Sequence, residues 1–261
     1  MRFKAIVLRA AGTNCDTETQ ASLELAGASS ELLHVNSLAQ EPRRLAHAQL
    51  LVLPGGFTFG DDVASGAVLA YTLKQRLADA LLAHVARGRL LLGICNGFQA
   101  LVRLGILPGG GGRAALARNL SGRFESRWVR LRGGRAPGPW FDANRDYQMP
   151  VAHGEGRFEY FPAQGESPDF PAEQIALTYV GEDGVAPGYP QNPNGSFLDI
   201  AAITNAGGNV MGLMPHPERF NQPANFPSWT RYRVPGQPVQ ERDLPVPIGL
   251  ELFRRIVRAG V

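Results

Sequence analysis

The segment RLLLGICNGFQALVRL, residues 89–104, places an apolar strand directly before an amphipathic helix. The run Arg89–Ile94 is short and almost wholly apolar, which is typical of a strand buried on both faces of a parallel sheet. In Asn96–Leu104 one helical face is formed by apolar residues that recur every three positions, namely Phe98, Leu101 and Leu104. A strand followed by a helix is the repeating unit of α/β folds, so this segment predicts that fold class.

The same alternation continues toward the N-terminus. Strands are predicted at Phe3–Arg9, Glu31–Asn36, Gln49–Leu53 and Arg89–Ile94, and helices at Asp16–Ala26, Arg43–Ala48 and Val63–Arg87. Parallel strands need long crossover connections, which are usually helices. We therefore expect a mostly parallel central sheet covered by helices on both faces.

The second half has a different pattern, in which strand-like runs are separated by loops rich in proline and glycine. Antiparallel strands are predicted at Arg123–Leu131, Gln174–Tyr179 and Asp199–Met214. The last of these runs contains a hairpin signal at Asn205–Asn209. Pro223–Pro247 is predicted to be irregular, and Gly249–Val257 to be a closing helix. Since no repeat or clean boundary appears, residues 1–261 are expected to form a single domain.

The composition, with 44% hydrophobic and 19% charged residues, is ordinary for a globular protein. No apolar run approaches the ~18 residues of a membrane span, and Met1–Leu8 resembles a strand rather than a signal peptide, so we expect a cytoplasmic protein without membrane contact. Arginines spread along the chain account for much of the net charge of +3, which argues against nucleic-acid binding. The densest basic stretch, Arg118–Arg135, is interpreted as a solvated surface, with a partner surface as the alternative.

Cys95 lies at the turn between the strand and the helix of residues 89–104. The pattern Gly93-Ile94-Cys95-Asn96-Gly97 is the thiol counterpart of a Gly-x-Ser-x-Gly nucleophile elbow, in which glycines leave room for a sharp turn. The helix start favours an anion, and the Asn96 N–H is the expected oxyanion donor. Most free cysteines are merely small buried residues, but the paired glycines favour a nucleophile here. Cys15, the other cysteine, lacks them and is interpreted as structural.

A thiol nucleophile needs a base, and histidine titrates in the suitable range. His216 lies between two prolines and two residues before Glu218, whose carboxylate would hold the imidazole in one tautomer. This His-x-Glu pattern also fits a surface loop or part of a metal site, but no third ligand is apparent, so no metal is predicted. His153, which precedes Gly154 and Glu155, receives no catalytic role; this segment is interpreted either as a tight turn with a charged tip or as a loop that lines a substrate pocket or contacts a partner. Ordinary packing or exposure explains the remaining histidines, His34, His47 and His84.

Three segments in this order resemble the class I, or triad, glutamine amidotransferases: Leu53-Pro54-Gly55-Gly56-Phe57, Gly93-Ile94-Cys95-Asn96-Gly97-Phe98-Gln99 and Met214-Pro215-His216-Pro217-Glu218-Arg219. The resemblance implies that Cys95 forms a glutamyl thioester, His216 is the base and Glu218 orients it. It also implies that Gly56 and Phe57 of the glycine turn, together with Asn96, supply the oxyanion donors, and that Gly55 belongs to the substrate-binding site. Gln99 would hold the amino-acid end of L-glutamine.

Within that class the chain resembles the family of glutaminase subunits of phosphoribosylformylglycinamidine synthase. The segments that carry this likeness are Leu8–Asp16, Gly55–Asp61, Val151–Phe158 and Asn194–Ser196. It implies release of glutamate and ammonia from glutamine for purine biosynthesis. This chain would need no cofactor, because ATP and Mg²⁺ would bind to a partner synthetase subunit, and a small bridging subunit could also take part.

Two departures qualify this likeness. Val63-Ala64 stands where many separate subunits have Leu-Arg, and Arg118–Arg127 looks like the long single-chain form of the enzyme. Three alternatives stay open at this point: a glutaminase of another pathway, a cysteine-elbow hydrolase or peptidase of similar fold, and an inactive binding subunit. The intact Cys95, His216 and Glu218 argue against the last.

Overall fold

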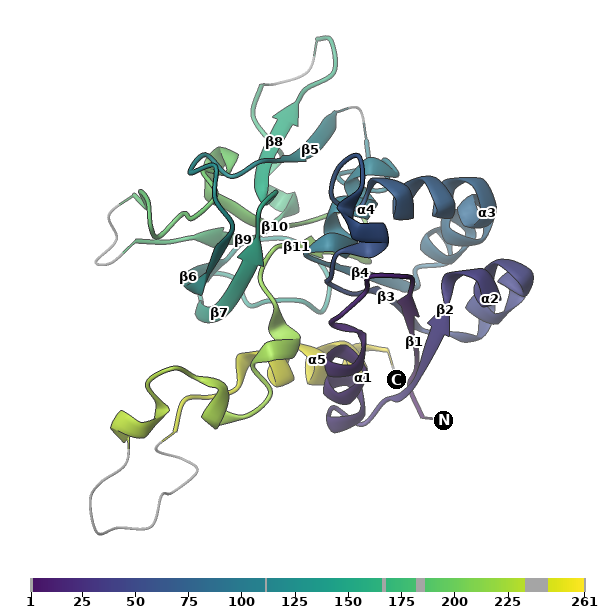
Figure 1. The fold of residues 1–261 in the computed structure, drawn as a ribbon, viewed down its shortest axis with the longest axis horizontal. Helices are drawn as coiled ribbons and strands as arrows, with labels where there is room; N and C mark the ends of the chain where they lie inside the picture. Colours follow the sequence, from purple (N-terminus) through teal and green to yellow (C-terminus); the bar gives the residue numbers. More distant parts are fainter. Residues whose placement is uncertain (1, 111, 166–167, 182–185, 233–243, 261) are drawn as a thin grey trace.

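The computed structural model describes residues 2–110, 112–165, 168–181, 186–232 and 244–260. In these residues a nine-stranded mixed sheet forms the centre, with the strand order β2-β1-β3-β4-β11-β10-β9-β6-β7 (Figure 1). Its parallel half contains β1 (Lys4–Arg9), β2 (Ser29–His34), β3 (Leu50–Leu53) and β4 (Leu90–Ile94). β3 is buried throughout and β4 from Leu91 to Ile94, as expected for central strands. The predicted parallel sheet is confirmed.

The antiparallel half contains β6 (Glu125–Gly133), β7 (Asp146–His153), β9 (Ile175–Tyr179) and β10 (Ile200–Thr204). The predicted hairpin is confirmed, since β10 pairs antiparallel with β11 (Val210–Leu213). On its other side β11 runs parallel to β4, and it thereby joins the two halves of the sheet. The position of β11 beside β4 brings the segment that follows it, including His216, toward the end of β4.

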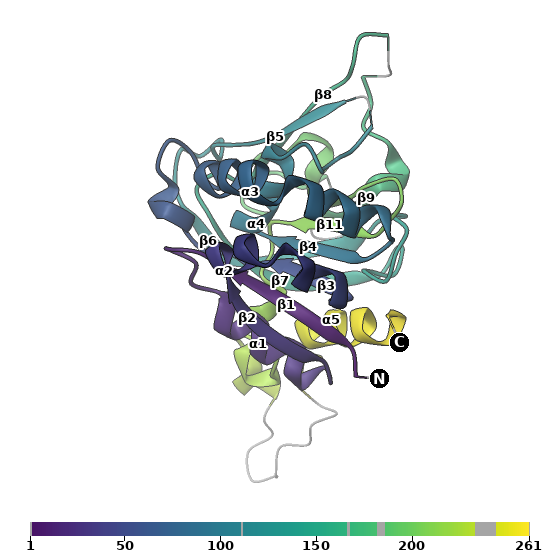
Figure 2. The same ribbon diagram turned by 90° about the vertical axis from the view of Figure 1, so that its right-hand side faces the viewer.

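Helices cover both faces of the parallel half, as predicted. One face carries α3 (Ala67–Ala86) and α4 (Asn96–Arg103), while α1 (Asp16–Leu25) and α5 (Ile248–Ala259) pack together on the other (Figures 1 and 2). The short α2 (Val35–Gln40) was not predicted; His34 caps it by accepting the N–H of Asn36 on its side chain.

Several predictions were wrong in detail. The helix predicted from Val63 begins only at Ala67, because Val63 and Gly66 have φ values of 71° and 72°, outside the helical region. Pro42–His47 is a 3₁₀ turn, η1, where a helix was predicted at Arg43–Ala48. A separate two-stranded sheet, β5 (Arg113–Ala117) with β8 (Arg157–Phe161), was not predicted.

The proline-rich stretch 223–247 is described only in part, since residues 233–243 lie outside the described residues. Pro223–Asn225 and Trp229–Tyr232 form short 3₁₀ turns, η7 and η8. Within the described ranges, no helix is both long and apolar enough for a membrane crossing.

Candidate active site

Cys95 occupies the sharp turn between β4 and α4. Its backbone has φ 49° and ψ −102°, a strained conformation that non-glycine residues rarely adopt and that is common at functional sites. The flanking glycines are required by close packing: a Cβ on Gly97 would lie 1.9 Å from the Leu53 carbonyl oxygen, and one on Gly93 would lie 2.6 Å from Leu101 Cδ1. The structure thus has the sharp, glycine-flanked turn that the sequence predicts at Cys95.

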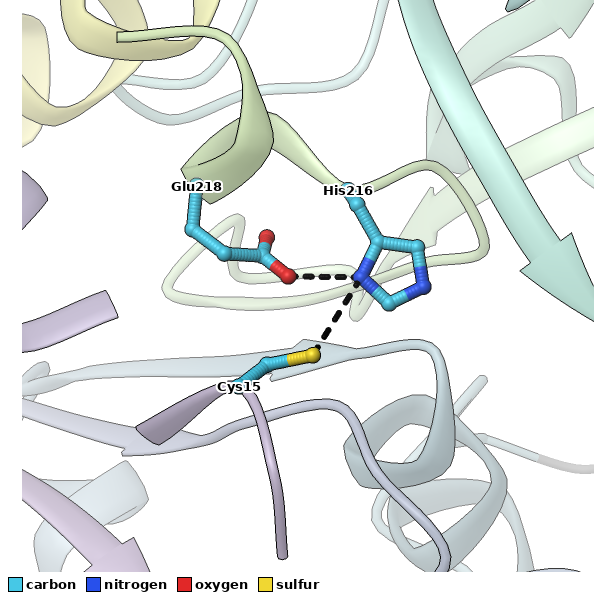
Figure 3. A group of neighbouring side chains, drawn as sticks. All are labelled: Cys15, His216 and Glu218. Atoms are coloured by element: carbon cyan, nitrogen blue, oxygen red, sulfur yellow. Dashed lines mark hydrogen bonds and ion pairs between the residues drawn. The ribbon is translucent and has the colours of Figure 1, made fainter. Parts of the chain in front are cut away.

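His216 and Glu218 form a buried pair directly after β11. The imidazole Nδ1 lies 2.6 Å from Glu218 Oε1, and the two side chains are 1% and 0% exposed. The other ring nitrogen, Nε2, points away from Glu218 (Figure 3) and has no hydrogen-bond partner among the described residues. Because the carboxylate fixes the proton on Nδ1, Nε2 is the nitrogen left for acid–base work.

The charge state of His216 is set by its neighbours. Burial alone would lower its pKa, but the Glu218 carboxylate and the Cys95 sulfur outweigh burial and hold the pKa well above its ordinary value. The imidazolium form is therefore favoured next to Cys95. A thiolate beside an imidazolium is the reactive form of a cysteine nucleophile.

Gly55 lies beneath the imidazole of His216. A Cβ at this position would be 2.7 Å from His216 Cε1 and 3.3 Å from Cys15 Sγ. The same turn pairs with the loop before α1: the Cys15 N–H donates to the Gly55 carbonyl, and the Phe57 N–H donates to the Gly12 carbonyl at 2.9 Å. Two segments far apart in sequence thus form the floor under the histidine.

Cys15 lies closer to the site than the sequence indicated. It is fully buried, and its Sγ lies 3.9 Å from His216 Nδ1 (Figure 3). The same sulfur lies 3.1 Å from Arg219 Nη2. The interpretation as a purely structural residue missed this contact because positions 15 and 216 meet only through tertiary packing. The unusual run Gly12–Asp16, part of the family resemblance, was the available signal.

Two sulfurs therefore influence one imidazole, Cys15 by direct contact and Cys95 through its charge, and their surroundings separate their roles. Cys15 faces Nδ1, whose proton is held by Glu218, so this nitrogen cannot accept a proton from Cys15. Cys95 has the elbow conformation and acts electrostatically on His216. The ligand atoms of Cys15, His216 and Glu218 lie within 4.8 Å of one another, close enough for a metal ion, but the Arg219 guanidinium contacts the same sulfur and disfavours a cation there. We assign no metal to them.

Asn96 and Gln99 are linked by their side chains. Asn96 Nδ2 donates to Gln99 Oε1 at 3.0 Å and to Asp61 Oδ1 at 2.9 Å, and Gln99 Nε2 donates to the Glu155 carbonyl. Gln99 thus connects α4 with the loop after β7. Both ends of its amide are engaged, so a direct contact with glutamine stays a prediction.

His153 ends β7 next to the elbow. The carbonyl of the preceding residue, Ala152, lies 3.6 Å from Cys95 Sγ. The imidazole is 2% exposed, and its Nδ1 lies 3.1 Å from Asn119 Oδ1. Burial, together with the charge of His216, lowers the pKa of His153 to about 3, so the ring stays neutral at ordinary pH.

Comparison with known proteins places these features in one family. The model of the CobB/CobQ-like glutamine amidotransferase domain matches residues 2–258. The phosphoribosylformylglycinamidine synthase subunit PurQ of Dehalococcoides mccartyi is 39% identical over 262 residues, which cover 98% of this chain and 97% of that protein. The PurQ subunit of Treponema denticola is 41% identical over 238 residues, covering 84% and 88% of the two chains.

Two solved structures from Thermotoga maritima have folds similar to that of this chain. A chain in the structure of PurLQS from Thermotoga maritima superimposes with a TM-score of 0.73 at 30% identity, covering 99% of both chains. A glutamine amidotransferase of the same organism has a TM-score of 0.55 at 14% identity, covering 100% of this chain and 98% of that one, which shows likeness of fold alone.

Proposed function

Since the chain belongs to the family of CobB/CobQ-like glutamine amidotransferase domains, we propose that it is the glutaminase subunit of a phosphoribosylformylglycinamidine synthase. It acts as a single cytoplasmic domain that hydrolyses L-glutamine and supplies ammonia to purine biosynthesis. The observation that carries this proposal is the strained Cys95 elbow beside the buried His216–Glu218 pair. The full-length similarity to PurQ subunits supports the pathway.

The reaction begins with the Cys95 thiolate, which attacks the carboxamide carbon of glutamine to form a C–S bond and a tetrahedral oxyanion. His216 gives its Nε2 proton to the amide nitrogen, the C–N bond breaks, and ammonia leaves a glutamyl thioester. Water then attacks the thioester. His216 accepts a proton from that water, the C–S bond breaks, and glutamate leaves with the thiolate restored.

Two backbone N–H groups stabilise the oxyanion. The Asn96 N–H opens α4 and, like all first-turn amides, has no acceptor within its own helix. The second donor is the Gly56 N–H, because the Phe57 N–H already donates to the Gly12 carbonyl. Phe57 is predicted as a donor from the resemblance, and this role stays a prediction; its half-exposed ring lies next to Phe124.

The ammonia must reach a second active site before it is protonated in water. The Thermotoga maritima structure that this chain resembles is of PurLQS, and we expect a corresponding synthetase subunit and a small bridging subunit as partners. ATP and Mg²⁺ would bind to the synthetase, and this chain would work without a cofactor of its own.

Labelling with a chloroketone analogue of glutamine tests the nucleophile. Mass spectrometry of the digested protein should show the adduct on Cys95, and glutamine should protect that residue. Cys95→Ala should lose the adduct and the glutaminase activity, whereas Cys15→Ala should still be labelled at Cys95. Labelling of Cys15 in preference to Cys95, or activity retained in Cys95→Ala, would refute the assignment.

Two alternatives differ in substrate. A cysteine-elbow peptidase or other hydrolase would use the same Cys95 and His216 but would not be protected by glutamine. A glutaminase of another pathway would be protected, yet would not support glutamine-dependent synthesis of phosphoribosylformylglycinamidine when mixed with the synthetase subunit of the same cell. The reconstituted assay therefore separates the pathway from the chemistry.

A further inference from the structure

The buried thiol of Cys15 has no part in the reaction above, although it lies against the catalytic histidine. Its Sγ lies 3.2 Å from Asn14 Oδ1, to which the S–H donates, and 3.1 Å from Arg219 Nη2, from which the sulfur accepts. The sulfur is thus a hydrogen-bond acceptor for a guanidinium. Such a pairing is unusual, because arginine is best matched to a carboxylate.

A carboxylate oxygen lies close by without a partner. Glu218 Oε1 accepts a hydrogen bond from the Nδ1–H of His216. Glu218 Oε2, in contrast, is buried and has no hydrogen-bond partner among the described residues. A buried oxygen in that state costs stability. Arg219 is the next residue in the chain and interacts electrostatically with Glu218, yet its guanidinium donates its hydrogen bond to Cys15.

We propose that Cys15 is a positioning residue whose sulfur holds the Arg219 guanidinium away from the free oxygen of Glu218, so that the carboxylate serves His216 alone. The inference rests on the proposed function, because it matters only if His216 is the base of Cys95. A guanidinium bound to Oε2 would compensate the charge of Glu218 and weaken its support for the imidazolium.

The charged and titratable groups that face His216 agree with this role. Glu218 and Cys95 raise the pKa of His216 against the effect of burial, and Cys15 adds to them through its contact with Nδ1. His153, on β7, is kept neutral by its own burial. Arg219 is a permanent cation that interacts with both Glu218 and Cys95, and its position decides how much of the Glu218 charge reaches His216.

The pH dependence of Cys95 labelling by the chloroketone analogue tests the proposal on the full chain. The thiolate is stabilised by the imidazolium, so weaker support for His216 moves labelling to higher pH. In Cys15→Ala we expect the half-maximal labelling pH to rise by about one pH unit. Cys15→Ser, whose hydroxyl can still accept from Arg219, should stay near wild type.

The decisive variant is the double substitution Cys15→Ala with Arg219→Met, which removes the competing cation. It should move the labelling pH back toward the wild-type value, short of it only by the direct contribution of Cys15 to the pKa of His216, and Arg219→Met alone should cause no upward shift. Thr19→Val is the matched control, because the Thr19 hydroxyl donates to the Cys15 carbonyl at 2.6 Å without touching the sulfur. Its labelling profile should equal that of wild type.

The outcomes separate this proposal from the one it rests on. If wild-type Cys95 is not labelled under glutamine-sensitive conditions, the glutaminase assignment fails. If labelling is normal but Cys15→Ala has the wild-type profile, or if Arg219→Met does not reverse its shift, Cys15 is only a packing residue and the glutaminase assignment stands.

Discussion

The imidazole of His216 rests on the backbone of Gly55 so closely that a Cβ at position 55 would lie 2.7 Å from His216 Cε1. Gly55 was predicted to bind substrate from the resemblance. In the structure the imidazole of His216 occupies the space that a side chain at position 55 would take. Glycine is therefore required at this position. The glycine turn and the His-x-Glu segment are therefore parts of one packing arrangement.

Gly55→Ala should displace His216 and lower kcat by about 10²-fold, because a shift of about 1 Å in a catalytic group can cost that much. The fold should persist, as judged by circular dichroism. Gly188→Ala is the control, because a Cβ on this exposed glycine would meet nothing within 4 Å. A Gly55→Ala enzyme with wild-type kcat would show that close packing against Gly55 is not needed to position the His216 imidazole.

Glu218→Gln should lower kcat by about 10²-fold, because the carboxylate that holds Nδ1–H of His216 is lost. The pKa of His216 is raised by Glu218 and Cys95 against burial, so removing the carboxylate should lower it. The alkaline limb of the pH–rate profile should then move to lower pH, since His216 must be protonated to release ammonia. Glu173→Gln, at an exposed position, should leave the limb in place. An unmoved limb in Glu218→Gln would contradict the assigned role.

His153 should make stability depend on pH. Its folded pKa of about 3 lies below the ordinary value of 6.5, so the unfolded chain binds a proton that the folded chain does not. Stability should fall as pH drops below about 6.5, with a contribution of about 2–3 kcal/mol lost between pH 7 and 4.5. Urea unfolding of His153→Gln should show a smaller loss over that range. His47→Gln, at an exposed position, should keep the wild-type dependence of the unfolding free energy on pH. The same dependence in all three proteins would show that His153 does not contribute to it.

Local sequence was enough to predict the elbow, because the strand, the turn glycines and the helix of residues 89–104 are contiguous. The start of α3 was misplaced, since apolar periodicity does not reveal the positive φ of Val63 and Gly66. β7 was not predicted either; it contains Pro150, which would disrupt a central strand but is tolerated at the last position of the sheet order.

The candidate site was predicted less completely than the fold. Cys95, His216 and Glu218 each have a local pattern, and the structure brings His216 and Glu218 into contact. The contact between Cys15 and Arg219 has no local pattern. It depends on the pairing of the Gly12–Cys15 loop with the turn at Gly55. These residues are distant in sequence, so secondary-structure propensity and apolar periodicity do not predict that they meet.

An ion-pair cluster joins the start of β7 to α5 and provides a last prediction. Arg145 donates to both oxygens of Glu251 at 2.6 and 2.8 Å, and Arg255 donates to Asp142. The hydrogen bond with Glu251 raises the pKa of Arg145, and the one from Arg255 lowers the pKa of Asp142. The cluster should therefore stabilise the fold above the unfolded pKa of Asp142, and this stabilisation should be lost as pH falls through the lowered folded pKa.

Glu251→Gln should lower the unfolding free energy by about 1 kcal/mol at low salt, because the side chains of Arg145 and Glu251 are 39% and 30% exposed and water screens the pair. The loss should shrink in 1 M NaCl, where the Debye length is about 3 Å. Glu31→Gln, which removes a more exposed pair with Arg44, should change stability by less than about 0.5 kcal/mol. A loss in Glu251→Gln that is independent of salt would mean that packing of α5, rather than charge, carries the contact.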